Sequence, residues 1–214
     1  MDKRGMLVII SGPSGSGKGT VVKELCKNSD YSLSVSMTTR AMRLGEVHGK
    51  DYFFCTEEEF VAKREAGELL EHAVFVGNLY GTSKAYVEEE IEKGKVVILE
   101  IDVEGALQVK EKFNDAVLIF LMPPTMIQLC HRLVNRNTEN KLTIEQRLIR
   151  AKKEIKYIPE YDYLVINDEV INAAKKIETI ASAEYLKPHR NESSIENFKG
   201  DEFDVASILL RAYE

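Results

Sequence analysis

The residues with the clearest chemical potential lie in SGPSGSGKGT, residues 11–20, a stretch of small residues with one lysine. It follows the apolar run at residues 6–10 and precedes a helical pattern, which is the context of a phosphate-binding loop. Glycines let the backbone N–H groups of such a loop turn inward and form an anion nest at a helix N-terminus. Lys18 adds a mobile positive charge for the outer phosphates. We predict that a nucleoside triphosphate binds through Gly12, Pro13, Ser14, Gly15, Ser16, Gly17, Lys18, Gly19 and Thr20.

The residue after the lysine departs from the usual loop pattern and leaves the magnesium ligand open. Gly19 stands where a serine or threonine commonly binds Mg²⁺. Either Thr20 supplies a hydroxyl from one position later, or waters and phosphates hold the ion, in keeping with its hydrated octahedral coordination. The Gly-Thr ending resembles the loops of adenylate-kinase-type enzymes, and it favours a small nucleotide kinase over a GTPase.

A short pattern further along the sequence is typical of GTPases rather than of nucleotide kinases. The sequence DVEG at residues 102–105 matches the D-x-x-G of GTPase switch regions. Four residues with two free positions are a weak signal, and the N-K-x-D guanine motif does not occur in the sequence. A signalling GTPase is therefore disfavoured.

A second cluster of chemistry-bearing residues lies in SVSMTTRAMRLGEVHGKDYFF, residues 34–54. Arg40 and Arg43 stand in a segment rich in Thr, Ser and Gly that has no helical apolar stripe. A loop of this kind is suited to bidentate binding of a phosphate, although a solvated basic face is the plainer alternative. Tyr52 and Tyr80 add hydroxyl donors. The pattern favours a second phosphate site.

The elements that must position these residues read as an α/β core with an insertion. Four runs rich in Val, Ile and Leu predict strands buried on both faces, as in a parallel sheet: residues 6–10, 96–101, 116–122 and 163–167. Helical patterns alternate with them at residues 17–27, 84–93, 103–112, 125–134 and 169–186, and TIEQ at residues 143–146 predicts a further helix start. Residues 34–82 break this rhythm with short β-like pieces around one helix, begun by the capping box at Thr56. We predict a core of residues 1–33 and 83–187, an inserted mixed subdomain at 34–82, and a tail at 188–214.

Length, charge and cysteine content restrict the class of protein further. A chain of 214 residues with a formal net charge of −6 lacks the positive footprint of a general nucleic-acid binder. It contains no apolar window of eighteen residues, and the run at residues 6–10 is too short for a signal peptide. Three cysteines without a C-x-x-C spacing indicate reduced thiols, and hence a cytoplasmic protein. The oligomeric state is left open.

Several long motifs in one order give the chain a specific resemblance. From residue 6 to residue 187 it is similar to the guanylate kinases, the ATP:GMP phosphotransferases among the nucleoside monophosphate kinases of the P-loop class. The resemblance is carried by the stretches at residues 11–20 and 34–54 and by GELLEHAVFVGNLYGTS, VILEIDVEGALQV, IFLMPPT, RLVNRNTE and YLVINDE. It implies a P-loop NTPase core with a central parallel sheet, a GMP-binding insertion at residues 34–82, a helical lid at 135–147, and magnesium as the cofactor of ATP.

The resemblance also implies roles for individual residues. The GMP phosphate would contact Arg40, Arg43, Tyr52 and Tyr80, and the guanine would face Ser36, Glu71, Thr82 and Asp102. The transferred phosphoryl group would meet Lys18, Arg40, Arg136 and Arg147, and the ATP adenosine would lie near Asn167. The chain departs from the family pattern at Asn137, where a glycine usually follows the lid arginine, and at Glu100, where aspartate is commoner.

The chemistry of guanine agrees with this assignment. Guanine presents N–H donors at N1 and N2, whereas adenine presents an acceptor at N1, so the acceptor-only carboxylate of Glu71 favours guanine. No general base is needed, because a phosphate monoester with its second pKa near 6 is mostly a dianion at neutral pH. The expected reaction is therefore ATP with GMP, and with dGMP. Two alternatives stay open: a non-catalytic interaction module of the same fold, and a kinase for a different nucleoside monophosphate.

Overall fold

The structure is a computed structural model that describes residues 4–75, 77–135, 140–199, 209 and 211–213. Arg136 and Asn137, which carry expectations about the lid, lie outside the described residues, as do residues 138 and 139 and much of the tail. The chain divides into two compact units, Met1–Lys176 and Ile177–Glu214. This division falls inside the last long helix, whereas the sequence places the start of the tail at residue 188. The boundaries at 34–82 and 135–147 therefore stay predictions.

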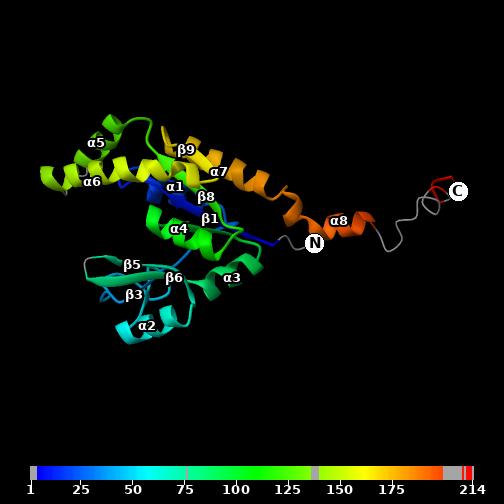
Figure 1. Cartoon of the computed structure of the whole chain (residues 1–214), viewed down its shortest axis with the longest axis horizontal. Helices are drawn as coiled ribbons and strands as arrows, with labels where there is room; N and C mark the ends of the chain where they lie inside the picture. Colours follow the sequence, from blue (N-terminus) through cyan, green and yellow to red (C-terminus); the bar gives the residue numbers. More distant parts are fainter. Residues whose placement is uncertain (1–3, 76, 136–139, 200–208, 210, 214) are drawn as a thin grey trace. The chain divides into compact units, whose positions relative to one another are not determined.

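A parallel sheet forms the centre of the first unit (Figure 1). Within the described part of the chain its five strands run in the order β2-β7-β1-β8-β9, and every neighbouring pair is parallel. Every residue of β1 is buried, because Val, Ile and Leu side chains fill both faces of the sheet. The predicted α/β class is confirmed. The strands are β1 (Met6–Ser11), β2 (Tyr31–Leu33), β7 (Val96–Glu100), β8 (Val117–Met122) and β9 (Tyr163–Ile166).

The strand β2 was not predicted from the sequence. Its three residues are only partly buried and include the exposed Leu33, so it lacks the continuous apolar run that marks the other four strands. It is recruited by backbone pairing with β7, where Tyr31 lies opposite Val96 and Leu33 opposite Ile98. A short edge strand of this kind is defined by its partner rather than by its own composition.

The helices follow the predicted alternation closely. Helix α4 spans the expected residues 103–112, and the start of α5 at Thr125 is confirmed, because its hydroxyl accepts the Gln128 N–H at 3.1 Å. Helices α1, α3 and α4 contact strands of the parallel sheet (Figure 1). The bounds are α1 (Lys18–Leu25), α3 (Lys84–Glu92), α4 (Val103–Lys112), α5 (Met126–Val134), α6 (Lys141–Glu154) and α7 (Val170–Glu184). Beyond α7, the second unit contains the short helix α8 (Glu192–Lys199).

The predicted helix start at Thr143 is wrong. Helix α6 begins at Lys141, and its N-cap is Asn140, whose side-chain oxygen accepts the Thr143 N–H at 2.9 Å. Asparagine is at least as good an N-cap as threonine. With Asn140 as the cap, the Thr143 N–H belongs to the first turn of the helix, and the Asn140 side chain satisfies it. Two equivalent capping residues three positions apart cannot be ranked from the sequence.

A second, mixed sheet occupies the segment that interrupts the core. Among the described residues its strands run β4-β3-β6-β5, with β3 parallel to β4 and antiparallel to β6. The mixed α+β composition expected of this segment is confirmed. Its elements are β3 (Met37–Thr38), β4 (Phe53–Phe54), α2 (Glu57–Glu65), β5 (Leu69–Phe75) and β6 (Asn78–Ser83). Phe60 of α2 is fully buried against Met37 and Leu69, and the Thr56–Glu59 capping box begins the helix as predicted.

Parallel topology brings the predicted site residues to one edge of the central sheet. The glycine-rich loop follows β1, Asp102 follows β7, and Asn167 follows β9, so each lies beyond the carboxyl end of its strand. In open α/β sheets ligands bind at this edge. No helix among the described residues is long and apolar enough to cross a membrane.

Candidate active site

The loop between β1 and α1 has the backbone of an anion nest. Gly12, Gly15 and Gly17 have positive φ values of 142°, 91° and 92°. A Cβ atom at Gly12 would lie 2.1 Å from the carbonyl oxygen of Leu121, so glycine is required there for close approach as well as for its dihedral angle. Gly17 is the N-cap of α1 and offers no side chain to the helix, so the first N–H groups point toward the loop.

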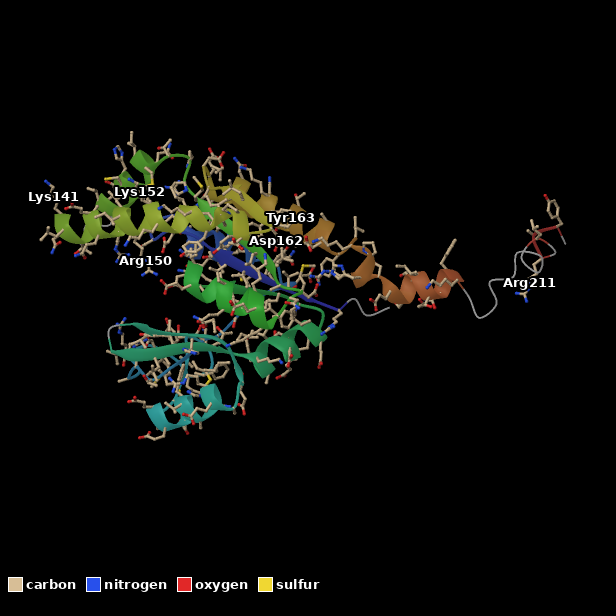
Figure 2. All side chains as sticks on the ribbon, viewed as in Figure 1. Lys141, Arg150, Lys152, Asp162, Tyr163 and Arg211 are labelled. Atoms are coloured by element: carbon tan, nitrogen blue, oxygen red, sulfur yellow. The ribbon has the colours of Figure 1, made fainter. Side chains whose placement is uncertain are left out.

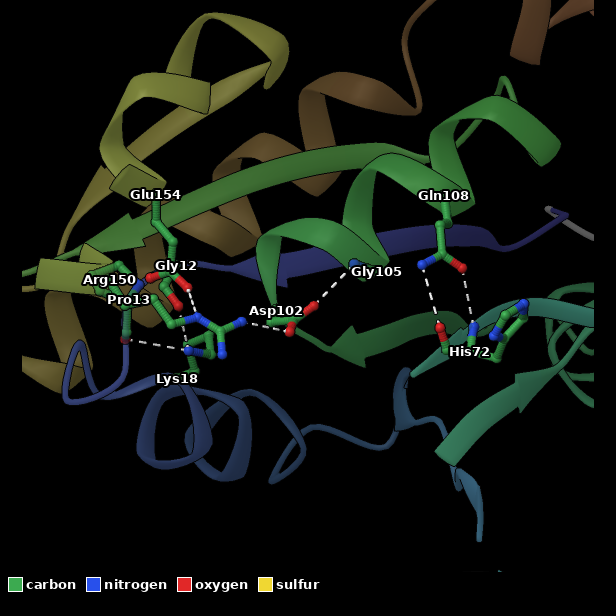
Figure 3. A network of polar contacts seen from close by, with 9 residues as sticks. All are labelled: Gly12, Pro13, Lys18, His72, Asp102, Gly105, Gln108, Arg150 and Glu154. Carbon is green, nitrogen blue, oxygen red and sulfur yellow. Dashed lines mark hydrogen bonds and ion pairs between the residues drawn. The ribbon is translucent and has the colours of Figure 1, made fainter. Parts of the chain in front are cut away.

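Lys18 lies across this loop (Figure 3). Its ammonium donates to the carbonyl oxygen of Gly12 at 2.6 Å and to that of Pro13 at 3.3 Å. The positive charge is thereby held at the mouth of the nest, where the outer phosphates of a nucleotide would take over these hydrogen bonds.

Two side chains from distant elements hold the loop from behind. Arg132 of α5 donates to the Ser16 carbonyl at 3.1 Å and to the Asn167 carbonyl at 2.8 Å. The Asn167 side-chain amide donates to the same Ser16 carbonyl at 2.8 Å, and Asn167 is only 2 % exposed. Asn167, expected near the ATP adenosine, therefore contacts the loop backbone. Arg132 was missed, because within the sequence it reads as one more basic residue in the last turn of an amphipathic helix.

The loop opens on a cavity of about 410 Å³, which we call the loop cavity. It gathers Lys18, Asp102 and Arg147 from three separate elements, and Arg147 donates to the Ser14 hydroxyl. Thr20 is exposed and is not among the lining residues. Three lining side chains were not predicted as site residues: Glu100, Arg150 and Glu154. The full lining is Gly12, Ser14, Lys18, Glu100, Ile101, Asp102, Arg147, Arg150 and Glu154.

Arg150 links α6, which begins within the predicted lid, to the carboxyl edge of the sheet. Figure 2 labels it on α6, and Figure 3 shows its contacts. Its guanidinium donates to Asp102 at 2.9 Å and to Glu154 at 2.8 Å. Asp102 also caps α4 by accepting the Gly105 N–H at 2.9 Å. Asp102, expected to face guanine, is thus shared between a helix cap and an ion pair at the wall of the loop cavity.

Removing this cation changes the charge of the cavity. In Arg150→Ala, Lys18 and Arg147 would face the carboxylates of Glu100, Asp102 and Glu154. We expect weaker binding of ATP by about fivefold, since an ion pair with one exposed partner contributes about 1 kcal/mol or less. Calorimetric titration with a non-hydrolysable ATP analogue measures the effect. Arg150→Lys keeps the charge and should retain most of the affinity; equal losses in both variants would contradict an electrostatic role.

A second cavity, of about 160 Å³, lies between the two sheets, and we call it the inter-sheet cavity. It brings together the predicted residues Ser36, Tyr52 and Thr82, from three segments of the insertion. Glu100 and Ile101 line it as well as the loop cavity. The two cavities therefore adjoin at the end of β7. The full lining is Leu33, Ser34, Ser36, Asp51, Tyr52, Thr82, Leu99, Glu100 and Ile101.

Glu71 is the buried carboxylate beside Thr82. It is 5 % exposed, and the Thr82 hydroxyl donates to its Oε1 at 2.7 Å. Burial raises the pKa of Glu71 above its ordinary value, with a further rise from the nearby charge of Asp102, while the Thr82 hydrogen bond opposes the shift. Its second oxygen lies near Gly105, where a Cβ atom would approach it to 3.4 Å. A ligand that offers N–H donors to this carboxylate relieves an unfavourable burial of charge.

Helix α4 fixes the strand that carries Glu71. The Gln108 side chain accepts the His72 N–H at 3.2 Å and donates to the His72 carbonyl at 3.3 Å (Figure 3). An amide side chain thus continues the backbone pairing of β5 and ties the insertion to the core. The sequence carried no signal for it, because a glutamine on a helix is ordinary.

The predicted phosphate-binding residues of the insertion form one cluster around Arg40. Its guanidinium lies 5.3 Å from the centre of the Tyr52 ring, and the Tyr52 and Tyr80 rings are 6.0 Å apart. Glu46 accepts from the Arg40 guanidinium at 2.7 Å and from the Arg43 N–H at 2.7 Å. Arg43 itself is exposed. Glu46 was missed; it orients Arg40 while leaving the face of the guanidinium stacked on Tyr52.

Comparison with known proteins identifies the family of the chain that contains these two cavities. Residues 4–184 match the guanylate kinase family. The guanylate kinase of Streptococcus thermophilus is 52% identical over 192 residues, covering 89% of this chain and 92% of the relative. That of Clostridium tetani is 48% identical over 193 residues, with coverages of 90% and 93%. The crystal structure of guanylate kinase from Anaplasma phagocytophilum aligns with a TM-score of 0.71 at 33% identity, covering 94% and 96% of the two chains. Because the match spans the phosphate loop, both sheets and both cavities, the chain belongs to the guanylate kinase family.

Proposed function

We propose that this protein transfers the γ-phosphoryl group of ATP to GMP, and to dGMP, giving ADP and the nucleoside diphosphate. The observation that carries the proposal is the shared wall of the two cavities at Glu100 and Ile101. One cavity opens from an anion nest with Lys18, and the other lies beside the buried carboxylate of Glu71. A donor and an acceptor nucleotide bound there would meet with their phosphates at the boundary, as direct transfer requires.

Base selection in this proposal rests on Glu71 and Thr82. The Thr82 hydroxyl already donates to one carboxylate oxygen, so the other oxygen is left to accept from guanine N1 and N2. Adenine would set its N1 lone pair against the carboxylate and leave a buried charge unpaired. A site built to bind polar groups rejects the wrong base by roughly 10⁴-fold on these grounds.

The phosphoryl transfer itself is a problem of charge rather than of proton transfer. The acceptor phosphate is a nucleophile without a base, and what opposes reaction is the repulsion between two polyanions. We assign Lys18, Arg40 and Arg147 to offset that repulsion, together with Arg136 of the proposed lid at residues 135–147. Lys18 and Arg147 line one cavity, and the Arg40 guanidinium lies over the ring of Tyr52, which lines the other, so each cavity has a cation beside it. Fixed charges of this kind favour the transition state.

Magnesium fits this donor set. The described residues contain no group of three or more His, Cys, Asp or Glu side chains that could hold a metal ion. Mg²⁺ needs no such cage, because it keeps several waters and binds through one or two carboxylates and the substrate phosphates. Glu100, at the wall of both cavities, is the carboxylate placed to hold it. When bound there, the ion would neutralise part of the charge of the substrate phosphates.

A non-catalytic interaction module is the competing proposal within the same fold. Such a module needs neither a lysine in the nest nor an arginine at its mouth, and this chain has Lys18 and Arg147 at those places. Their presence favours catalysis. We further propose a cytoplasmic location, which the free thiols of Cys26, Cys55 and Cys130 support.

The test is an acceptor panel with coupled detection of ADP. GMP and dGMP should be turned over, whereas AMP, UMP and dTMP should give kcat/KM values lower by roughly 10⁴-fold. Omission of magnesium should abolish the reaction. Turnover of AMP comparable to that of GMP would overturn the base assignment, and no turnover with any acceptor would favour the interaction module.

A further inference from the structure

The strand that carries Glu71 is irregular at that residue. Leu69 of β5 lies opposite Ser83 of β6. The next pair is Glu71 with Thr82, so Leu70 is an extra residue in β5. A bulge of this kind bends its strand and changes the direction of a neighbouring side chain, and bulges are common beside active sites. Pairing with β6 therefore does not by itself determine where the Glu71 carboxylate lies.

The other edge of β5 is held by side chains of helix α4. In the sheet order β4-β3-β6-β5 this strand is the last, so among the described residues that edge has no strand beside it. Gln108 accepts the His72 N–H at 3.2 Å and donates to the His72 carbonyl at 3.3 Å, as a residue of a neighbouring strand would (Figure 3). Lys112, one helical turn later, donates to the Leu69 carbonyl at 3.1 Å. Glu71 thus lies between the two backbone positions that α4 holds.

The bulge and the carboxylate also pack on α4. Leu70 is 1 % exposed and shares a hydrophobic cluster with Ala106 and Val109 of the helix. Oε2 of Glu71 lies against Gly105, 3.4 Å from the position of a Cβ atom there. Because α4 follows β7 of the central sheet, the core positions this carboxylate, although the insertion carries it.

We propose that Gln108 and Lys112 are positioning residues for the selection of guanine. By holding the backbone on both sides of Glu71, they place its free oxygen where it can accept from guanine N1 and N2 together. Hydrogen bonds weaken steeply as their geometry departs from linear, so a displaced carboxylate would keep one of these two bonds at most. Neither residue lines either cavity. The inference rests on the proposed binding of GMP at Glu71 and adds the residues that make that site selective.

The first test compares GMP with IMP, the same nucleotide without the 2-amino group. Gln108→Met removes both hydrogen bonds to β5 and keeps the length of the side chain. GMP binding, measured by calorimetric titration, should weaken by about 5- to 10-fold, a loss that two neutral hydrogen bonds can account for. IMP binding should weaken by only about twofold, because IMP makes no bond through N2. A general loosening of the insertion would instead weaken both nucleotides alike.

The second test is a double-mutant cycle with Glu71. In the Glu71→Gln background, Gln108→Met should have little further effect on GMP affinity, because its effect passes through the carboxylate. Lys112→Met supplies an independent variant at an exposed position, where the substitution should not disturb folding. It should reduce the preference for GMP over IMP in the same direction and by a smaller factor.

Controls separate this role from a purely structural one. Gln128→Met changes an exposed glutamine of another helix, α5, and should bind GMP and IMP as wild type does. ADP affinity should be the same in Gln108→Met and wild type, since Gln108 does not line the loop cavity. The His72 N–H should exchange its hydrogen faster in Gln108→Met. Thermal unfolding of each variant checks that it is folded.

Three results would overturn the inference. They are an unchanged preference for GMP over IMP in Gln108→Met and Lys112→Met, losses of GMP affinity that simply add in the double variant, or unchanged hydrogen exchange at His72 in Gln108→Met. Glu71→Gln by itself tests the proposed function. If that variant weakens GMP binding and Gln108→Met does not, only the positioning role fails; if Glu71→Gln binds GMP as wild type does, the guanine assignment fails first.

Discussion

Replacing Lys18 with methionine should lower kcat by about 10²- to 10³-fold, the usual consequence of removing one charged donor that stabilises a transition state. Methionine matches the length of the lysine stem, so the loop backbone, held by its glycines and by Arg132, should persist. The ammonium donates to the carbonyls of Gly12 and Pro13, and Gly12 and Lys18 line the open loop cavity. We therefore expect a loss of rate with little loss of stability.

Steady-state kinetics with saturating GMP and varied ATP measure this effect, and thermal unfolding measures stability. Lys27→Met is the matched control, because Lys27 is an exposed lysine beyond the end of the same helix. It should leave kcat unchanged. Near-normal turnover of Lys18→Met would remove the glycine-rich loop from the mechanism, even if ATP still bound.

Glu71→Gln should weaken GMP binding by roughly 10- to 150-fold, because a hydrogen bond to a charged group contributes about 1.5–3 kcal/mol. The amide keeps the shape and can still accept from Thr82, but it presents an N–H where guanine also presents one. The KM for ATP should change little. Discrimination against AMP should shrink, since the amide can donate to adenine N1.

The exposed Glu65, at the end of α2, supplies the control for this substitution. Glu65→Gln should have wild-type affinity for GMP. If Glu71→Gln binds GMP as wild type does, guanine lies elsewhere and the assignment of the inter-sheet cavity fails.

The pH dependence of GMP affinity, compared between wild type and Glu71→Gln, independently tests whether the Glu71 carboxylate binds guanine. The pKa of Glu71 is raised in the folded protein, so the carboxyl becomes protonated at a higher pH than an ordinary glutamate. GMP affinity of the wild type should fall as the pH drops through that raised pKa. The GMP phosphate titrates in both proteins alike, so the difference between wild type and Glu71→Gln isolates the carboxyl.

The free energy of unfolding should depend on pH in the opposite sense to GMP affinity. Because the folded state binds the Glu71 proton more tightly than the unfolded state, its contribution to stability is present at low pH and is lost as the pH rises through the raised pKa. At neutral pH the buried charge costs stability, and Glu71→Gln should be at least as stable as wild type. Denaturant unfolding at pH 4.5 and pH 7.5 measures the difference.

Local signals in the sequence predicted much of the core. The strands β1, β7, β8 and β9 were all predicted from apolar runs, and burial on both faces is confirmed for β1, β7 and β8, because a strand covered on both faces must be apolar throughout. For β9 that burial is wrong: Val165 is the one buried residue among its four, and Leu164 is exposed. The capping residues Thr56 and Thr125 mark helix starts for an equally local reason, since a side chain there satisfies orphan N–H groups within one turn. Where local signals were ambiguous, as at Asn140 and Thr143, the prediction was wrong.

Residues whose importance depends on distant partners were the ones missed. Arg132 matters because Ser16 and Asn167 fold against it, from 116 and 35 residues away along the chain. Arg150 meets Asp102 from 48 residues away, and Gln108 meets His72 from 36. The residues that flank them in the sequence do not distinguish Arg132, Arg150 and Gln108 from ordinary charged or polar helix positions.

The sequence by itself determined the α/β class, the phosphate loop and the set of arginines and carboxylates from which a nucleotide site is built, because each depends on residue type and short-range spacing. The tertiary structure alone decided which of those side chains share a cavity, that Glu100 lines both cavities, and that its carboxylate lies close to Gly19. Parallel strand order places residues that are far apart in the chain at one edge of the sheet. Which of their side chains come within contact distance depends on the folded arrangement of the strands, and short-range spacing in the sequence does not specify it.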